Sequence, residues 1–115
     1  MLSLLAAVTT GGRAQESGEV QEGDASYYAD SLHGRPTANG ETYDRNALTA
    51  AHPSLPFGTR LRVTSVETGK SVVVVVNDRG PYADGRIVDL SRAAARAIGL
   101  IDEGHARVQL QVVEP

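Results

Sequence analysis

The chain of 115 residues contains no cysteine and no tryptophan, and the first of these absences excludes several kinds of site. Without cysteine the sequence offers no disulfide, no thiolate metal ligand, no thiol nucleophile and no lipid-modified cysteine, so we expect no membrane anchor of that kind. The formal net charge of -3 argues against a nucleic-acid partner, because such proteins usually present a basic face. With only one phenylalanine and four tyrosines, the core must be largely aliphatic.

The first 23 residues differ in composition from the rest of the chain. Residues 1–8 (MLSLLAAV) are apolar, and Gly12-Arg13-Ala14 is an acceptable cleavage site, although no basic residue precedes the apolar stretch. We interpret residues 1–14 as a signal peptide, with a frayed tail as the alternative; the stretch is too short for a membrane span. Residues 15–23 are polar and predict a flexible linker to a folded domain over 24–115. This organisation predicts export to the periplasm or cell wall.

From residue 24 onward the hydrophobic pattern predicts short strands. Residues 60–66 alternate, with Leu61, Val63 and Ser65 on one face. Five consecutive valines at 72–76 predict a strand covered on both faces, as inside a barrel. Further strands are expected at 24–29, 86–90 and 106–114.

One short helix is expected after Ser91, which can cap it, and before Gly99, which suits the position past its end. Asp89 is expected to help begin this helix. Its apolar stripe would consist of Leu90, Ala94, Ala97 and Ile98. The pattern predicts a mainly β domain with one helix, closed as a small barrel, although periodicity alone leaves a sandwich open.

Polar candidates for a site lie in two segments. The first is the irregular stretch 32–59, and an irregular stretch of that length in a small domain is usually functional. The second begins with NDRGP, directly after the valine run. From spacing alone, Asp78 can equally bond backbone amides in a turn, Glu41 can be a solvated turn residue, and His52 can be a structural histidine.

Four motifs in order, HGRPTANGE, LTAAHPSLPFGT, VNDRGP and RIVDLSRAAA, resemble the rare lipoprotein A (RlpA) family of peptidoglycan lytic transglycosylases. The similarity covers about residues 23–113. The resemblance implies a six-stranded double-psi β-barrel, related to the barrels of expansins and barwin-like proteins. It also implies action on peptidoglycan glycan strands. We expect a monomer without cofactor, and no metal, because the sequence has no close-spaced histidine pair. Because the sequence ends after its last predicted strand, we expect no C-terminal glycan-binding module.

By the same resemblance, Asp78 is expected to be the general acid and base, with Glu41 and His52 orienting the sugar and tuning Asp78 through hydrogen bonds. Partial desolvation at the end of a buried strand would favour the protonated form of Asp78. We expect the Arg79 side chain to point away from it, or to bind an acetamido or carboxyl oxygen of the glycan. The expected substrate-binding residues are Tyr28, His33, Thr37, Asn39, Asn77, Arg79 and Tyr82.

The reaction implied by the resemblance needs only one carboxyl group. The C6 hydroxyl of N-acetylmuramic acid attacks its own anomeric carbon, so the nucleophile belongs to the substrate, and one residue can serve as acid and then as base. Hydrolytic glycosidases instead require two carboxylates at a defined separation. We therefore expect an endolytic lytic transglycosylase, with an expansin-like binding module and a secreted inhibitor or effector scaffold as alternatives. Of Tyr27 and Tyr28, one must face the core, because neighbours on a strand point oppositely.

Overall fold

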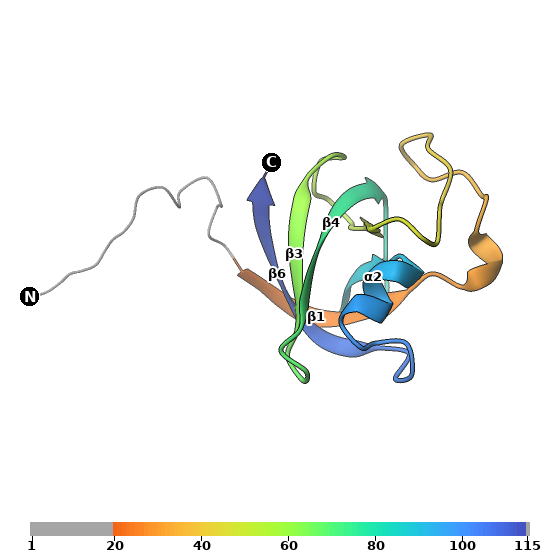
Figure 1. Cartoon of the computed structure of the whole chain (residues 1–115). Coiled ribbons are helices and arrows are strands. Elements are labelled where there is room, and N and C mark those ends of the chain that lie inside the picture. Colours follow the sequence, from red (N-terminus) through yellow and green to blue (C-terminus); the bar gives the residue numbers. More distant parts are fainter. Residues whose placement is uncertain (1–19, 115) are drawn as a thin grey trace, which may run out of the picture.

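The computed structural model describes residues 20–114, which form a closed barrel of six strands with one short α-helix (Figure 1). Around the barrel the strand order is β1-β5-β2-β4-β3-β6. The predicted six-stranded barrel is confirmed, and the sandwich is excluded. The strands are β1 (Val20–Tyr27), β2 (Thr49–Ala51), β3 (Arg60–Ser65), β4 (Ser71–Asp78), β5 (Arg86–Leu90) and β6 (Ala106–Glu114); the helices are the 3-10 turn η2 (Asp30–Leu32) and α2 (Arg92–Ala97).

Two strand pairs in this barrel are parallel, and neither joins strands that are consecutive in the sequence. β1 pairs with β5 and β2 with β4 in parallel, whereas the other four pairs are antiparallel. Parallel neighbours cannot be joined by a tight hairpin, so the chain must cross over between them. The connection from β1 to β2, residues 28–48, is the longest, and Figure 1 shows it projecting from the barrel in gold and yellow.

The core is a single aliphatic cluster inside the barrel and under α2. On β3 the predicted alternation is confirmed, because Leu61, Val63 and Ser65 are all buried. On β4 the valine run is covered unevenly: Val74 and Val76 are fully buried, while the other three valines keep partial exposure. One face of β4 therefore carries most of the packing, rather than both faces equally as predicted.

Two boundaries differ from the sequence-based prediction. Strand β1 begins at Val20, where it pairs with Gln111 of β6, so residues 20–23 are strand rather than linker. Strand β2 lies inside the stretch 32–59, which we expected to be irregular. It was not predicted because three residues are too few to show a strand period. The predicted signal peptide over residues 1–14 lies outside the described residues.

Helix α2 begins as predicted, with Ser91 as its cap. The Ser91 hydroxyl accepts a hydrogen bond from Ala94 N (3.3 Å) and donates to the carbonyl of Ala47 (2.6 Å), which ties the helix to the β1–β2 connection. The buried face uses Ala94, Ala95 and Ile98, whereas Ala97, which we expected in the stripe, is exposed. Neither described helix is long and apolar enough to cross a membrane.

Asp89 does not begin this helix, and that prediction is wrong. Its carboxylate accepts hydrogen bonds from the Ser26 hydroxyl and from the Arg86 guanidinium, both at 2.6 Å. Ser26 lies on β1, which pairs with β5, so Asp89 is occupied by its neighbouring strand rather than by the helix end. Ser91 alone supplies the side-chain cap.

We predict that Ser91→Ala lowers the free energy of unfolding by about 1–3 kcal/mol, because the buried cap is lost together with the bonds of the Ser91 hydroxyl to Ala47 O and Thr49 N. Urea denaturation followed by circular dichroism measures this. Ser71→Ala, at an exposed position that starts β4, is the matched control and should change stability little. Equal effects of the two substitutions would contradict the role of Ser91.

Candidate functional site

Asp78 is the last residue of β4, and three hydrogen bonds fix its carboxylate. The backbone amides of Ala38 and Arg79 both donate to Oδ1, at 2.8 and 2.9 Å. The hydroxyl of Tyr28 donates to Oδ2. Because Oδ1 is held by two rigid donors, Oδ2 is the oxygen available for a proton. The side chain is partly exposed, so this oxygen remains within reach of a ligand.

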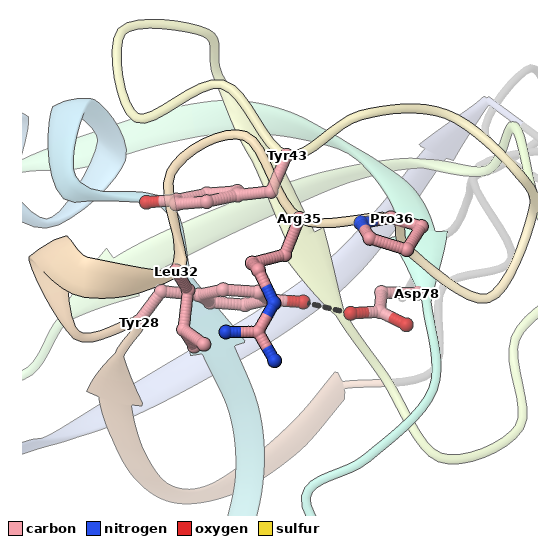
Figure 2. A pocket seen from close by; sticks show the side chains of 6 residues that line it. All are labelled: Tyr28, Leu32, Arg35, Pro36, Tyr43 and Asp78. Carbon is pink, nitrogen blue, oxygen red and sulfur yellow. Dashed lines mark hydrogen bonds between the residues drawn. The ribbon is translucent and has the colours of Figure 1, made fainter.

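A cavity of about 270 Å³ lies beside this carboxylate. Figure 2 shows the rings of Tyr28 and Tyr43 one above the other, with the Tyr28 hydroxyl pointing at Asp78. The ring centroids are 4.4 Å apart and the planes are inclined by 21°. The cavity is lined by Tyr28, Leu32, Arg35, Pro36, Tyr43 and Asp78.

Tyr43 is a residue of this site that the sequence-based predictions missed. It is 2% exposed, and its hydroxyl accepts a hydrogen bond from the Arg92 amide at the start of α2 (3.1 Å). Its own amide donates to Arg35 O at 2.7 Å, and its carbonyl accepts from Gly34 N at 2.9 Å. Tyr43 therefore fixes both the projecting connection and the ring of Tyr28 against the barrel.

Tyr28 and Tyr27 point to opposite sides of β1, as expected. The Tyr27 hydroxyl donates to Ile101 O at 2.9 Å, and its ring packs on the core. Tyr28 faces the cavity instead, and its amide donates to Leu90 O at 3.0 Å, which continues the pairing of β1 with β5. Burial, together with the bond to the Asp78 carboxylate, raises the pKa of Tyr28 far above its usual value, so the phenol keeps its proton and acts as a donor.

A tight loop over residues 36–42 brings the Ala38 amide to Asp78. Pro36 and Thr42 form an isolated bridge at its base, and Thr37 N donates to Glu41 O at 2.7 Å. The Asn39 side-chain oxygen accepts from Glu41 N at 3.0 Å and lies 2.7 Å from the Thr37 hydroxyl. Thr37 and Asn39, predicted as substrate contacts, thus also build the loop internally.

Asn77 connects this loop to the end of β4. It is buried, its side-chain amide donates to Glu41 Oε1 at 3.1 Å, and its carbonyl lies 3.3 Å from Asn39 N. The Glu41 side chain is therefore bonded to Asn77, the residue before Asp78, and not to Asp78 itself. The carboxylate of Asp78 receives its hydrogen bonds from Tyr28, Ala38 and Arg79, not from Glu41 or His52 as expected.

His52 follows β2 and is 4% exposed. Its Nδ1 accepts from the amides of Ser54 and Leu55, both at 3.1 Å, so the proton belongs on Nε2, which lies 3.1 Å from Gln21 Oε1. Burial, and secondarily the charge of Arg79, lower the pKa of His52, so the imidazole is neutral. The ring holds the turn after β2, while the His52 amide donates to Asp78 O at 3.1 Å.

The Arg79 side chain points away from the Asp78 carboxylate, which was one of the two expected orientations. Its guanidinium carbon lies 4.0 Å from the Phe57 ring centroid, and Nη1 donates to His52 O at 3.3 Å. The residues of the NDRGP segment therefore have different roles. Asn77 holds the loop, Asp78 faces the cavity, Arg79 supports the turn after β2, and Gly80 takes a φ of +112° that disfavours a side chain.

Of the seven predicted substrate contacts only Tyr28 lines this cavity, and His33 and Tyr82 are among the six that do not. His33 is exposed, its Nδ1 accepts from Arg45 N at 3.1 Å, and its ring meets Tyr43 edge-on at 6.4 Å. Tyr82 is 78% exposed. Among residues 20–114, no three His, Asp or Glu side chains are grouped as metal ligands.

Comparison with known proteins shows that the sequence is similar to one family over most of its length. The sequence profile of the family described as lytic transglycolase matches residues 20–110. A protein from Synechocystis sp., described as a probable endolytic peptidoglycan transglycosylase RlpA, is 51% identical over 110 residues, which are 96% of this chain and 34% of that protein. The chain thus spans about a third of the length of this curated relative.

Solved structures with similar folds agree on the barrel. The Streptomyces papain inhibitor superposes with a TM-score of 0.68 at 25% identity, covering 84% of this chain and 96% of that one. The expansin of Clavibacter michiganensis, in its apo form, superposes with a TM-score of 0.67 at 24% identity, covering 84% and 52%. The fold is therefore the double-psi β-barrel that the motifs predicted.

The buried imidazole predicts a pH dependence of stability. Because the pKa of His52 is lower in the folded chain than the usual 6.5, the unfolded chain binds a proton first as the pH falls. Stability should therefore be lost below about pH 6.5, by at most about 1.4 kcal/mol per pH unit for this one proton, until the folded protein also binds it. Urea denaturation between pH 7.5 and 5.0 measures the slope.

In His52→Gln this loss of stability between pH 7.5 and 5.0 should disappear, whatever the free energy of unfolding of the variant at pH 7.5. The exposed His105, changed to Gln, is the control and should keep the wild-type slope. An unchanged slope in His52→Gln would show that His52 does not carry the effect.

Proposed function

The chain belongs to the lytic transglycolase family, and from this we propose that it cleaves peptidoglycan glycan strands as an endolytic lytic transglycosylase. The bond broken would be the β-1,4 linkage between N-acetylmuramic acid and N-acetylglucosamine, leaving 1,6-anhydro ends. The site of action would be the periplasm or cell wall, where this polymer lies. One observation carries the proposal most: Asp78 is the one carboxylate among the residues that line the cavity.

A single carboxyl group suits transglycosylation better than hydrolysis. Hydrolytic glycosidases use two carboxyl groups about 5–10 Å apart, the second as nucleophile or as base for water. In the proposed reaction the muramyl C6 hydroxyl is the nucleophile, so no second carboxyl group is needed. One residue then gives a proton and later takes one back. The uneven hydrogen bonding of Asp78 suits such a role, because Oδ1 stays fixed while Oδ2 exchanges the proton.

The proposed steps balance without another reactant. Protonated Oδ2 of Asp78 gives its proton to the glycosidic O4 as the bond from the muramyl C1 to O4 breaks. The resulting carboxylate then takes the proton of the C6 hydroxyl as O6 bonds to C1. Asp78 ends protonated, ready for the next strand.

Tyr28 would stabilise the intermediate carboxylate in this cycle. Its hydroxyl donates to Oδ2, the oxygen that becomes negative after the first proton transfer. A hydrogen bond to a charged acceptor is stronger than one to a neutral acceptor, so the contact strengthens as negative charge develops on Oδ2. The ring stacked on Tyr43 keeps the hydroxyl in place for both steps.

The other predicted residues take supporting parts in this proposal. Glu41 and Asn77 keep the loop at 36–42 over the end of β4, and His52 holds the turn beside it. Direct substrate contacts by His33, Thr37, Asn39 and Tyr82 stay predictions.

Asp78→Asn should reduce cleavage by about 10²–10⁴-fold, because an amide cannot serve as acid and base. The amide oxygen can still accept from Ala38 N and Arg79 N, so the fold and glycan binding should be kept. Mass spectrometry of digested sacculi counts the anhydro-muramyl ends, and sedimentation with sacculi measures binding.

Full cleavage by a folded Asp78→Asn protein would refute the role of this residue. A wild-type protein that binds sacculi but produces no anhydro ends would instead support the alternative of a non-catalytic, expansin-like binding module.

Tyr28→Phe should lower kcat by about tenfold or more with little change in KM, since it removes one charge-assisted hydrogen bond while keeping the stacked ring. Tyr27→Phe is the matched control, because that hydroxyl bonds Ile101 O on the other side of β1. Steady-state kinetics on soluble glycan strands separates the two. Similar losses in both variants would show that Tyr28 acts only through general stability.

A further inference from the structure

Arg35 contributes a positive charge to the cavity beside Asp78 and has no hydrogen-bond or ion-pair partner for its side chain among residues 20–114. Its backbone is nevertheless fixed on both sides. The Arg35 amide donates to Leu32 O at 3.0 Å, and its carbonyl accepts from Tyr43 N at 2.7 Å. Figure 2 shows Arg35 with Tyr28, Tyr43 and Asp78 among the residues that line the cavity.

Three other arginines of the domain already have partners for their side chains. Arg79, which we expected to bind a carboxyl or acetamido oxygen, is held by Phe57 and by the carbonyl of His52. Arg45 is paired with Asp30 at 3.2 Å, and Arg86 with Asp89 at 2.6 Å. Arg35 is the cation that the cavity leaves available.

A guanidinium on a fixed backbone is suited to a carboxylate, which it can bind through two parallel hydrogen bonds. Muramyl units differ from the other sugars of the strand by their lactyl ether, which ends in a carboxylate when it bears no peptide. When it bears a peptide, the carboxylates belong to the peptide. Leu32 and Pro36 line the same cavity and offer apolar surface to the methyl group next to such a carboxylate.

We propose that Arg35 binds a carboxylate of the muramyl unit and thereby determines which strands are accepted at Asp78. This inference rests on the proposed function for its substrate. It transfers to Arg35 the recognition role that the NDRGP motif had suggested for Arg79.

The test compares soluble glycan strands whose carboxylates are free with the same strands after conversion of the carboxylates to primary amides. Two sets are used, one stripped of peptides and one bearing them. Wild-type kcat/KM should fall by about 10–100-fold on amidation, the range expected for one charged hydrogen-bonded contact. A loss confined to stripped strands identifies the lactyl carboxylate, and a loss confined to peptide-bearing strands identifies the peptide carboxylate.

Arg35→Gln should lose the same factor on the free strands, mainly through KM, and should be insensitive to amidation. Arg35→Lys should keep part of the discrimination. Arg62→Gln removes the same charge from an exposed position on β3, outside the cavity lining, and should behave as wild type. If amidation affects Arg35→Gln as much as wild type, or affects wild type on neither set, the inference is overturned.

Failure of the proposed function would be recognised separately. If wild type forms no anhydro ends on any strand, the same comparison is made on equilibrium binding of the four strand preparations. Discrimination that depends on Arg35 would then support carboxylate binding without cleavage, and its absence would overturn the inference.

Discussion

The hydrogen bond from the Ala38 amide to Asp78 Oδ1 joins the two parts of the molecule that make the site. Asp78 belongs to the barrel, at the end of β4, whereas Ala38 belongs to the long connection between β1 and β2. Because β5 lies between β1 and β2 in the barrel, this connection has to span it, and its loop at 36–42 closes on the carboxylate. Without that contact Asp78 would keep its bonds to Arg79 N and to the Tyr28 hydroxyl, but Oδ1 would lose the one donor that comes from the connection.

The stacked tyrosines extend the same constraint to the helix. Tyr43 receives the Arg92 amide at the start of α2, and its ring positions Tyr28, whose hydroxyl reaches Asp78. Ser91, one residue before, bonds to the connection through Ala47 O. The cap of a six-residue helix and the orientation of the candidate acid are therefore parts of one continuous set of contacts.

The elements predicted correctly are those fixed by local patterns. Strands β5 and β6 and the cap at Ser91 depend on alternation or on a neighbour three residues away. Tyr43 was missed because its importance lies in partners distant along the chain, Tyr28 and Arg92. Arg35 was missed because only the folded chain shows that it lines a cavity with Asp78. Asp89 was misassigned because a partner on β1 competes with the nearby helix end, and sequence spacing cannot weigh the two. The family motifs identified Asp78, but its hydrogen-bond donors became known only from the coordinates.

Closure of the barrel between β1 and β6 gives every strand two neighbours, so an edge remains only where one strand extends past its partner, as at residues 20–23 and 71–74. An unpaired edge is a template for pairing with another chain, and proteins with such edges must block them with charges or prolines. Most of the backbone in this barrel needs no such device, because it is paired on both sides. Its outer surface, above all the projecting connection, is consequently free to vary for ligand recognition without the risk of strand-mediated self-association.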